Sequence, residues 1–127
     1  MTPTLPHILI AEREFLIALD AEYLIKSAMD CRVSLIRPEQ LDQWEAGAFA
    51  DVDLCLLDVP VDASRIAGKV RRLQDHAVPV VFTTVSDIHR SGVERFGSVP
   101  VIMKPYDAHV LAETVAAHLR RRPEPQA

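Results

Sequence analysis

Short apolar runs recur along the chain, and most of them stop at a polar residue. The clearest run is Leu54-Cys55-Leu56-Leu57, which ends at Asp58. Near-continuous apolarity over so few residues is typical of a parallel strand that helices cover on both faces. Similar runs end in Glu12, in Thr83-Thr84 and in Lys104-Pro105. Together with a shorter run at 33–36, they predict five strands: His7–Ala11, Val33–Ile36, Asp53–Leu57, Pro79–Thr83 and Val99–Met103.

Between these runs, apolar residues recur at helical spacing. The stretch Asp87–Phe96 is an exception, because it is weakly patterned and contains Gly92, so any helix there is short. Alternating strand and helix patterns predict an α/β fold, with a parallel sheet in the order 2-1-3-4-5 and helices on both faces. The expected helices are Phe15–Met29, Pro38 to near Gly47 with Trp44 as a packing residue, Ala63–Asp75, and Asp107–Arg121 with Asp107 as its cap.

Length and composition narrow the class of protein. A chain of 127 residues with 49% apolar residues predicts one globular domain, here 7–121, with disordered ends at 1–6 and 122–127. The net charge of −4 gives no reason to expect a nucleic-acid partner. Apolar stretches of about five residues are too short to span a membrane, so we expect no membrane partner and a cytoplasmic location. Two cysteines make neither a disulfide framework nor a metal site.

The polar residues at the strand ends form the candidate site. In an open parallel sheet the carboxyl ends of the strands lie together, and ligands bind in the crevice outside them. Asp58, Glu12, a threonine hydroxyl and the Lys104 ammonium would therefore meet at one edge. Carboxylates suit a divalent cation, and an ammonium and a hydroxyl suit a phosphoryl group.

Four segments in the right order resemble the receiver domain of bacterial two-component response regulators. They are HILIAEREFLIALDAEYL, DVDLCLLDV, VPVVFTTVSD and VIMKPYD, and the likeness spans His7 to about Arg121. The resemblance implies a flavodoxin-like, doubly wound fold and a signalling protein rather than an enzyme. It also implies that Asp58 accepts a phosphoryl group from a sensor histidine kinase or a phosphotransfer protein.

The resemblance assigns roles to the other strand-end residues. Lys104 and Thr84 would contact the phosphoryl group, with Thr83 as a competitor for the hydroxyl role. Mg²⁺ would be held by Glu12, by Asp58 and by the backbone carbonyl of Pro60. The peptide bond between Lys104 and Pro105 would be cis.

Three positions depart from the family pattern. Arg13 stands where a second acid usually contacts the metal, which puts Mg²⁺ in question. Val101 replaces an aromatic residue of the switch, and Asp62 replaces a proline. Arg13 has two alternatives: its guanidinium donates a paired hydrogen bond to Asp58 in place of a metal, or its side chain extends into solvent.

These residues support three functional hypotheses. The first is a single-domain response regulator in a phosphorelay, phosphorylated on Asp58 and acting through a downstream protein partner. The second is a degenerate receiver, a binding module that works without phosphorylation. A flavin- or nucleotide-binding protein of the same topology is the third, and the loop Glu12-Arg13-Glu14-Phe15 argues against it because it offers acids where glycines should cradle phosphates.

The expected partner surface consists of the last helix, the fifth strand and a short fourth helix within Asp87–Phe96. A homodimer through the same region is an alternative use of this surface. Leu111, Val115 and Leu119 should face the sheet. The residues expected to point outward are His109, Glu113 and Arg120.

Overall fold

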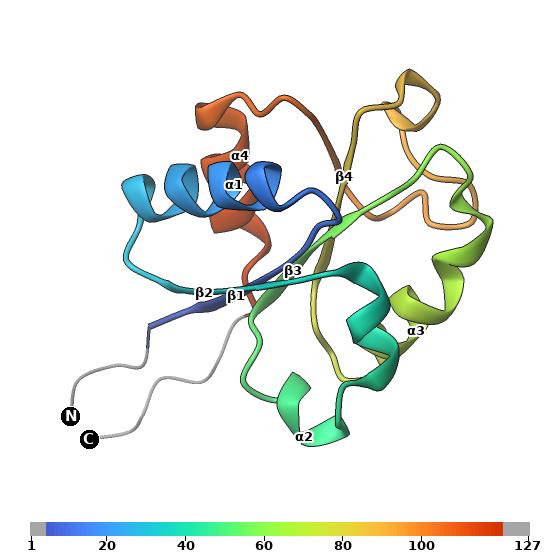
Figure 1. The fold of residues 1–127 in the computed structure, drawn as a ribbon, viewed down its shortest axis with the longest axis horizontal. Coiled ribbons are helices and arrows are strands. Elements are labelled where there is room, and N and C mark those ends of the chain that lie inside the picture. The colour runs from blue at the N-terminus through green and yellow to red at the C-terminus, as the bar shows by residue number, and fades with distance from the viewer. Residues whose placement is uncertain (1–4, 121–127) are drawn as a thin grey trace.

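The computed structural model describes residues 5–120, which form a five-stranded parallel sheet flanked by helices (Figure 1). The strand order is β2-β1-β3-β4-β5, and every neighbouring pair is parallel, as the sequence predicts. β3 and β4 each end one residue later than expected, so that Asp58 and Thr84 are the last strand residues. The strands are β1 His7–Ala11, β2 Arg32–Ile36, β3 Leu54–Asp58, β4 Val80–Thr84 and β5 Val101–Met103.

Helices α1 (Phe15–Ala28) and α4 (Ala108–His118) lie side by side on one face of the sheet (Figure 1). Side chains alternate across a strand, so every second strand residue points to this face. Ile8 and Ile10 of β1 meet Ala18 and Ala21 of α1 there. Leu111 and Val115 of α4 are fully buried in the same cluster, and Leu119 packs partly against it.

The opposite face is covered by α2 (Ala46–Phe49) and α3 (Ala67–Asp75) (Figure 1). The single helix predicted from Pro38 to near Gly47 is wrong. A 3₁₀ helix spans Pro38–Gln43, and Trp44 and Glu45 are extended before α2 begins. A 3₁₀ turn likewise occupies Ala63–Arg65, so the α-helix predicted from Ala63 begins four residues later. These interruptions let the backbone run close to the sheet, where Leu41, Phe49 and Ile66 are buried in one core cluster.

The connection between β4 and β5 differs most from the expected architecture. A 3₁₀ turn at Asp87–His89 is its helical element, and an isolated bridge joins Val93 to Phe96. Within the described residues, this connection contains no α-helix, and the short fourth helix expected within Asp87–Phe96 is wrong. Gly92 has φ +134°, which an L side chain rarely adopts and which a helix does not contain. The expected partner surface accordingly lacks its fourth helix.

The chain just after α4 is anchored at the amino edge of the sheet. The Arg120 backbone N–H donates to the carbonyl of Asp53, at the start of β3. Its guanidinium donates to the carbonyls of Phe49 and His76. The prediction that Arg120 points outward is therefore wrong, because a helix-end arginine satisfies carbonyls that the loops leave open. His109 and Glu113 are exposed, as expected, and His109 Nε2 lies 3.0 Å from Glu113 Oε1.

At the other end, Leu5 and Pro6, which the sequence assigns to a disordered terminus, accept hydrogen bonds from Arg32. The disorder expected for 1–4 and 122–127, and the last helical residue expected at Arg121, lie outside the described residues. Within 5–120, the longest apolar helix is too short to cross a membrane.

Asp107 caps α4 by accepting hydrogen bonds from the backbone N–H groups of His109 and Val110 (2.9 and 3.0 Å). Asp107→Ala should lower the free energy of unfolding by about 1 kcal/mol, because it leaves both donors without that acceptor. Asp107→Asn is the matched control, since asparagine caps nearly as well. Urea denaturation measures both variants, and equal losses for alanine and asparagine would contradict the capping role.

Candidate functional site

The Lys104 ammonium joins two carboxylates at the carboxyl edge of the sheet. Its Nζ lies 2.7 Å from Glu12 Oε1 and 2.7 Å from Asp58 Oδ1. Lys104 follows β5, Glu12 follows β1 and Asp58 ends β3, so three strands contribute to one cluster. The three side chains are only 2–5% exposed. Buried charges persist when they are paired and hydrogen-bonded, and here each charge has an opposite neighbour.

Arg13 occupies the outer side of the same cluster. Its Nε donates to Asp58 Oδ2 at 2.7 Å, while half of its side chain stays exposed. Of the two alternatives for Arg13, the structure therefore has the contact with Asp58, through a single hydrogen bond rather than a pair. This hydrogen bond raises the pKa of the guanidinium, which stays charged at any physiological pH.

Each carboxylate oxygen of Glu12 and Asp58 has a protein donor. Lys104 takes one oxygen of each residue and Arg13 takes Asp58 Oδ2. The remaining oxygen, Glu12 Oε2, accepts the backbone N–H of Glu14 at 3.0 Å and thereby shapes the turn into α1. With two carboxylates and two cations, the cluster is formally neutral.

The two candidate threonines lie on opposite sides of β4. Thr83 is the register partner of Asp58, so their side chains share a face. The hydroxyl of Thr84 donates to the carbonyl of Val59 at 3.4 Å and accepts from the backbone of Ser86. Among the hydrogen bonds of residues 5–120, neither threonine hydroxyl reaches the Asp58 carboxylate, and both side chains are buried.

His89 stabilises the loop that follows Asp58, a role that the sequence does not predict. Its Nε2 lies 3.2 Å from the carbonyl oxygen of Pro60 and 2.9 Å from that of Val61. Because both partners only accept, Nε2 carries the proton and links the loop after β3 to the turn after β4. His89 sits in the weakly patterned stretch, so local periodicity offers no signal of this contact.

The oxygen ligands that the resemblance assigns to Mg²⁺ already have other partners in this structure. Glu12 and Asp58 are both engaged with cations, and the Pro60 carbonyl is engaged with His89. Residues 5–120 contain no group of three or more His, Cys, Asp or Glu side chains able to hold a metal ion. A divalent cation here would also meet the Arg13 guanidinium at close range. The arrangement does not fit a bound Mg²⁺.

The Lys104 backbone is paired with the end of β4, because its N–H donates to the carbonyl of Thr84 at 2.8 Å. The peptide bond between Lys104 and Pro105 is cis, as the resemblance implies. Burial raises the pKa of the Tyr106 phenol, which therefore stays protonated.

Asp62, at one of the departures from the family pattern, is exposed and caps the turn at Ser64. Val101, at another, is half-buried in β5.

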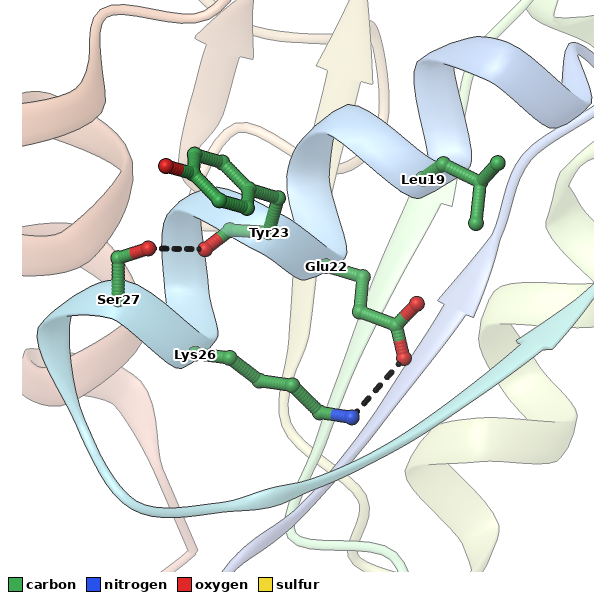
Figure 2. A pocket seen from close by; sticks show the side chains of 5 residues that line it. All are labelled: Leu19, Glu22, Tyr23, Lys26 and Ser27. Carbon is green, nitrogen blue, oxygen red and sulfur yellow. Dashed lines mark hydrogen bonds and ion pairs between the residues drawn. The ribbon is translucent and has the colours of Figure 1, made fainter.

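Two clefts lie among the loops that follow the strands, and the first of them borders the cluster. One, of about 260 Å³, is lined by Glu12, Arg13, Phe15, Arg37 and Gln40 among others. The other, of about 540 Å³, lies between the loop after β3 and the β4–β5 connection, with His89 in its wall. Figure 2 shows a third hollow on the outer surface of α1, lined by residues 19–27, that none of the cluster residues touches.

Solved structures share this arrangement of strands over nearly their whole length. The receiver domain of PhyR from Erythrobacter litoralis has a TM-score of 0.71 and 24% identity, covering 98% of this chain and 97% of that one. The BeF3-activated conformation of SdrG from Pseudomonas melonis Fr1 has a TM-score of 0.64 and 28% identity, covering 91% and 98%. The chain has the fold of a response regulator receiver domain.

The response regulatory domain of mrkE from Klebsiella pneumoniae has the same receiver fold, with a TM-score of 0.68 and 19% identity over 88% of this chain and 93% of that one. No protein-family model matches the sequence, and no curated protein matches it either. The receiver fold is thus recognised through structure, at identities where pairwise sequence comparison has little power.

Lys104→Met should lower the free energy of unfolding by about 3–5 kcal/mol, because it leaves two buried carboxylates without their shared cation. Lys26→Met is the matched control. It breaks the exposed ion pair with Glu22 that Figure 2 shows, and it should cost about 0–1 kcal/mol. Urea denaturation compares the two variants, and equal losses would show that the Lys104 cluster is not formed in solution.

Proposed function

We propose that this receiver domain accepts a phosphoryl group on Asp58 from a sensor histidine kinase or a phosphotransfer protein. The observation that carries the proposal is the buried Lys104 ammonium 2.7 Å from Asp58 Oδ1. Phosphoryl transfer depends mainly on the positioning of the reacting groups and on neutralisation of their charge, and less on the strength of the nucleophile. A carboxylate at a strand end, held beside a buried cation, meets both requirements.

The neighbouring residues support this role. Glu12 also accepts a hydrogen bond from the Lys104 ammonium, and this second partner would hold the ammonium in place while the phosphoryl group arrives. A hydroxyl from Thr83 or Thr84 would then donate to the phosphoryl group. Thr84 requires a side-chain rotation away from the Val59 carbonyl, and Thr83 requires none to share a face with Asp58. Alanine variants at each position distinguish the two.

The response reaches a downstream partner protein through a surface near this site. The proposed partner surface is the outer side of α4, which carries the exposed residues His109 and Glu113. A homodimer through the same side is the alternative. The fold offers a second exposed surface, because Phe15, Leu16 and Tyr23 of α1 are 66–79% exposed. Exposed apolar groups of this size are typical of protein contacts.

The alternative function is a binding module that needs no phosphorylation. The specific observation in its favour is that both Asp58 oxygens already have a cationic donor, which stabilises the unmodified carboxylate. Such a module would bind the same partner whether or not Asp58 can be modified. Partner binding by Asp58→Asn and Asp58→Ala, compared with the wild type, separates this function from the first.

Asp58 should carry the single phosphoryl group. Incubation with phosphoramidate, or with a cognate kinase, should give an alkali-labile acyl phosphate, and Asp58→Asn should abolish it because an amide cannot attack phosphorus. Asp62→Asn is the control: Asp62 is an exposed aspartate of the same edge, and asparagine can still cap Ser64. Phosphate retained by Asp58→Asn would refute the assignment.

The outer side of α4 is tested by His109→Ala combined with Glu113→Ala. Their contact is exposed, so the free energy of unfolding should change by less than about 0.5 kcal/mol, while partner binding or self-association weakens. Lys26→Met, on the outer surface of α1, serves as the comparison. Tyr23→Ala, which removes an exposed aromatic side chain of α1, tests the other surface. Unchanged association in the α4 variant together with a loss in Tyr23→Ala would move the partner surface to α1.

A further inference from the structure

The two oxygens of Asp58 differ in how their partners are exposed. Oδ1 is bound by Lys104, whose side chain is 5% exposed, whereas Oδ2 is bound by Arg13, whose side chain is 50% exposed. A phosphoryl donor arriving from solvent therefore meets Arg13 first and Oδ2 behind it. An attack through Oδ2 would therefore require Arg13 to release this oxygen.

Arg13 also supplies the charge that a divalent cation would bring. An acid at this position would leave Glu12, Asp58 and the acid itself facing one ammonium, an excess of two negative charges. A bound Mg²⁺ would cancel that excess. Replacing the acid by arginine changes the local charge by the same two units and gives a neutral cluster without a metal. Electrostatic balance thus requires no ion.

The oxygens that a metal would need are already bonded. Arg13 holds Asp58 Oδ2, Lys104 holds Asp58 Oδ1 and Glu12 Oε1, and His89 holds the Pro60 carbonyl. A cation that binds Asp58 Oδ2 would have to displace the charged guanidinium of Arg13. At the Pro60 carbonyl it would compete with the N–H of His89, which also donates to the carbonyl of Val61. Both contacts oppose a bound cation.

We infer that Asp58 is phosphorylated without a divalent cation, and that Arg13 moves from Asp58 Oδ2 onto the arriving phosphoryl oxygens. This inference rests on the proposed acceptor role of Asp58. Oδ2 forms the bond to phosphorus as the P–N bond of the donor breaks, and the electron pair stays on the departing nitrogen, which takes up a proton from solvent.

The geometry around Arg13 allows this movement. A planar guanidinium can donate two parallel hydrogen bonds to phosphoryl oxygens. In this structure Arg13 donates to Asp58 through Nε alone, so this paired mode of donation is not used. The side chain is half-exposed and borders the cleft of about 260 Å³ shared with Glu12, Arg37 and Gln40, so a neighbouring position is open to it. His89 keeps the loop after Asp58 in place during the exchange.

The test is phosphorylation of the full chain by phosphoramidate with either excess Mg²⁺ or a strong chelator. The wild type should react equally well in both. Arg13→Gln should react about a hundredfold more slowly in both, because it removes one charged donor to the transferring group. Arg13→Asp should regain a metal requirement, reacting about tenfold or more faster with Mg²⁺ than with chelator, as a restored metal ligand predicts.

Arg37→Gln is the matched control, an arginine of the same cleft that does not contact Asp58, and it should behave like the wild type. Mg²⁺ titration followed by the amide chemical shifts of Glu12 and Asp58 gives a readout independent of turnover. Saturable shifts are expected for Arg13→Asp at concentrations that leave the wild type unchanged. Beryllofluoride, a phosphoryl mimic, should shift the same signals of the wild type in the presence of chelator.

Two results would overturn the inference in different ways. Wild-type phosphorylation on Asp58 that needs Mg²⁺ would show that a metal displaces Arg13, and the acceptor role of Asp58 would stand. Failure of the wild type and of Arg13→Asp in both buffers, with folding intact by circular dichroism, would reject the acceptor role itself and leave the binding module.

Discussion

A buried ammonium between two carboxylates organises this receiver fold. Lys104 is contributed by the last strand, and its partners Glu12 and Asp58 come from the first and third strands, so the cluster ties residues 46 and 92 positions apart in the chain. No charge of the three could lie this deep without the others, because an isolated buried ion costs far more than the fold can supply. The register of three strands is thereby tied to one set of charges: a strand that slipped by one residue would point its charge to the other face of the sheet.

Much of this was readable from the sequence, for a physical reason. Parallel strands are apolar along their length and meet at their carboxyl ends, so the pattern itself placed Glu12, Asp58 and Lys104 together. Local sequence does not predict elements whose form depends on distant backbone. Pro38 and Leu41 indicate one helix, but the burial of Phe49 ends it at Trp44. Arg120 stands at a position expected to face outward, yet three carbonyls distant in the sequence accept its hydrogen bonds. His89 left no local trace, because its partners lie 28 and 29 positions away.

Arg13 shows how a single position can change the chemistry of a site without changing its fold. The backbone of the turn after β1 is set by the Glu12 carboxylate accepting the N–H of Glu14, a contact that does not involve the residue between them. The side chain at 13 is therefore free to be acidic or basic while strand, turn and helix remain as they are. The charge of the side chain at position 13 can therefore change without a change of fold. Proteins with this fold can differ at this position in whether their site needs a metal ion.

The missing helix between β4 and β5 has a consequence for how the domain deforms. From Val85 to Pro100 the backbone is held by turns, by one isolated bridge and by the His89 hydrogen bonds, and its buried anchors are His89, Val93 and Val99. Local opening free energies are lowest where buried apolar contacts are few and hydrogen bonds lie near solvent. Within residues 5–120, this connection has sparse buried contacts and begins one residue after Thr84, whereas α1 and α4 pack on a continuous core. A disturbance at the carboxylates would reach this less restrained connection, and its motion, rather than a preformed helix, would carry the disturbance to the surface.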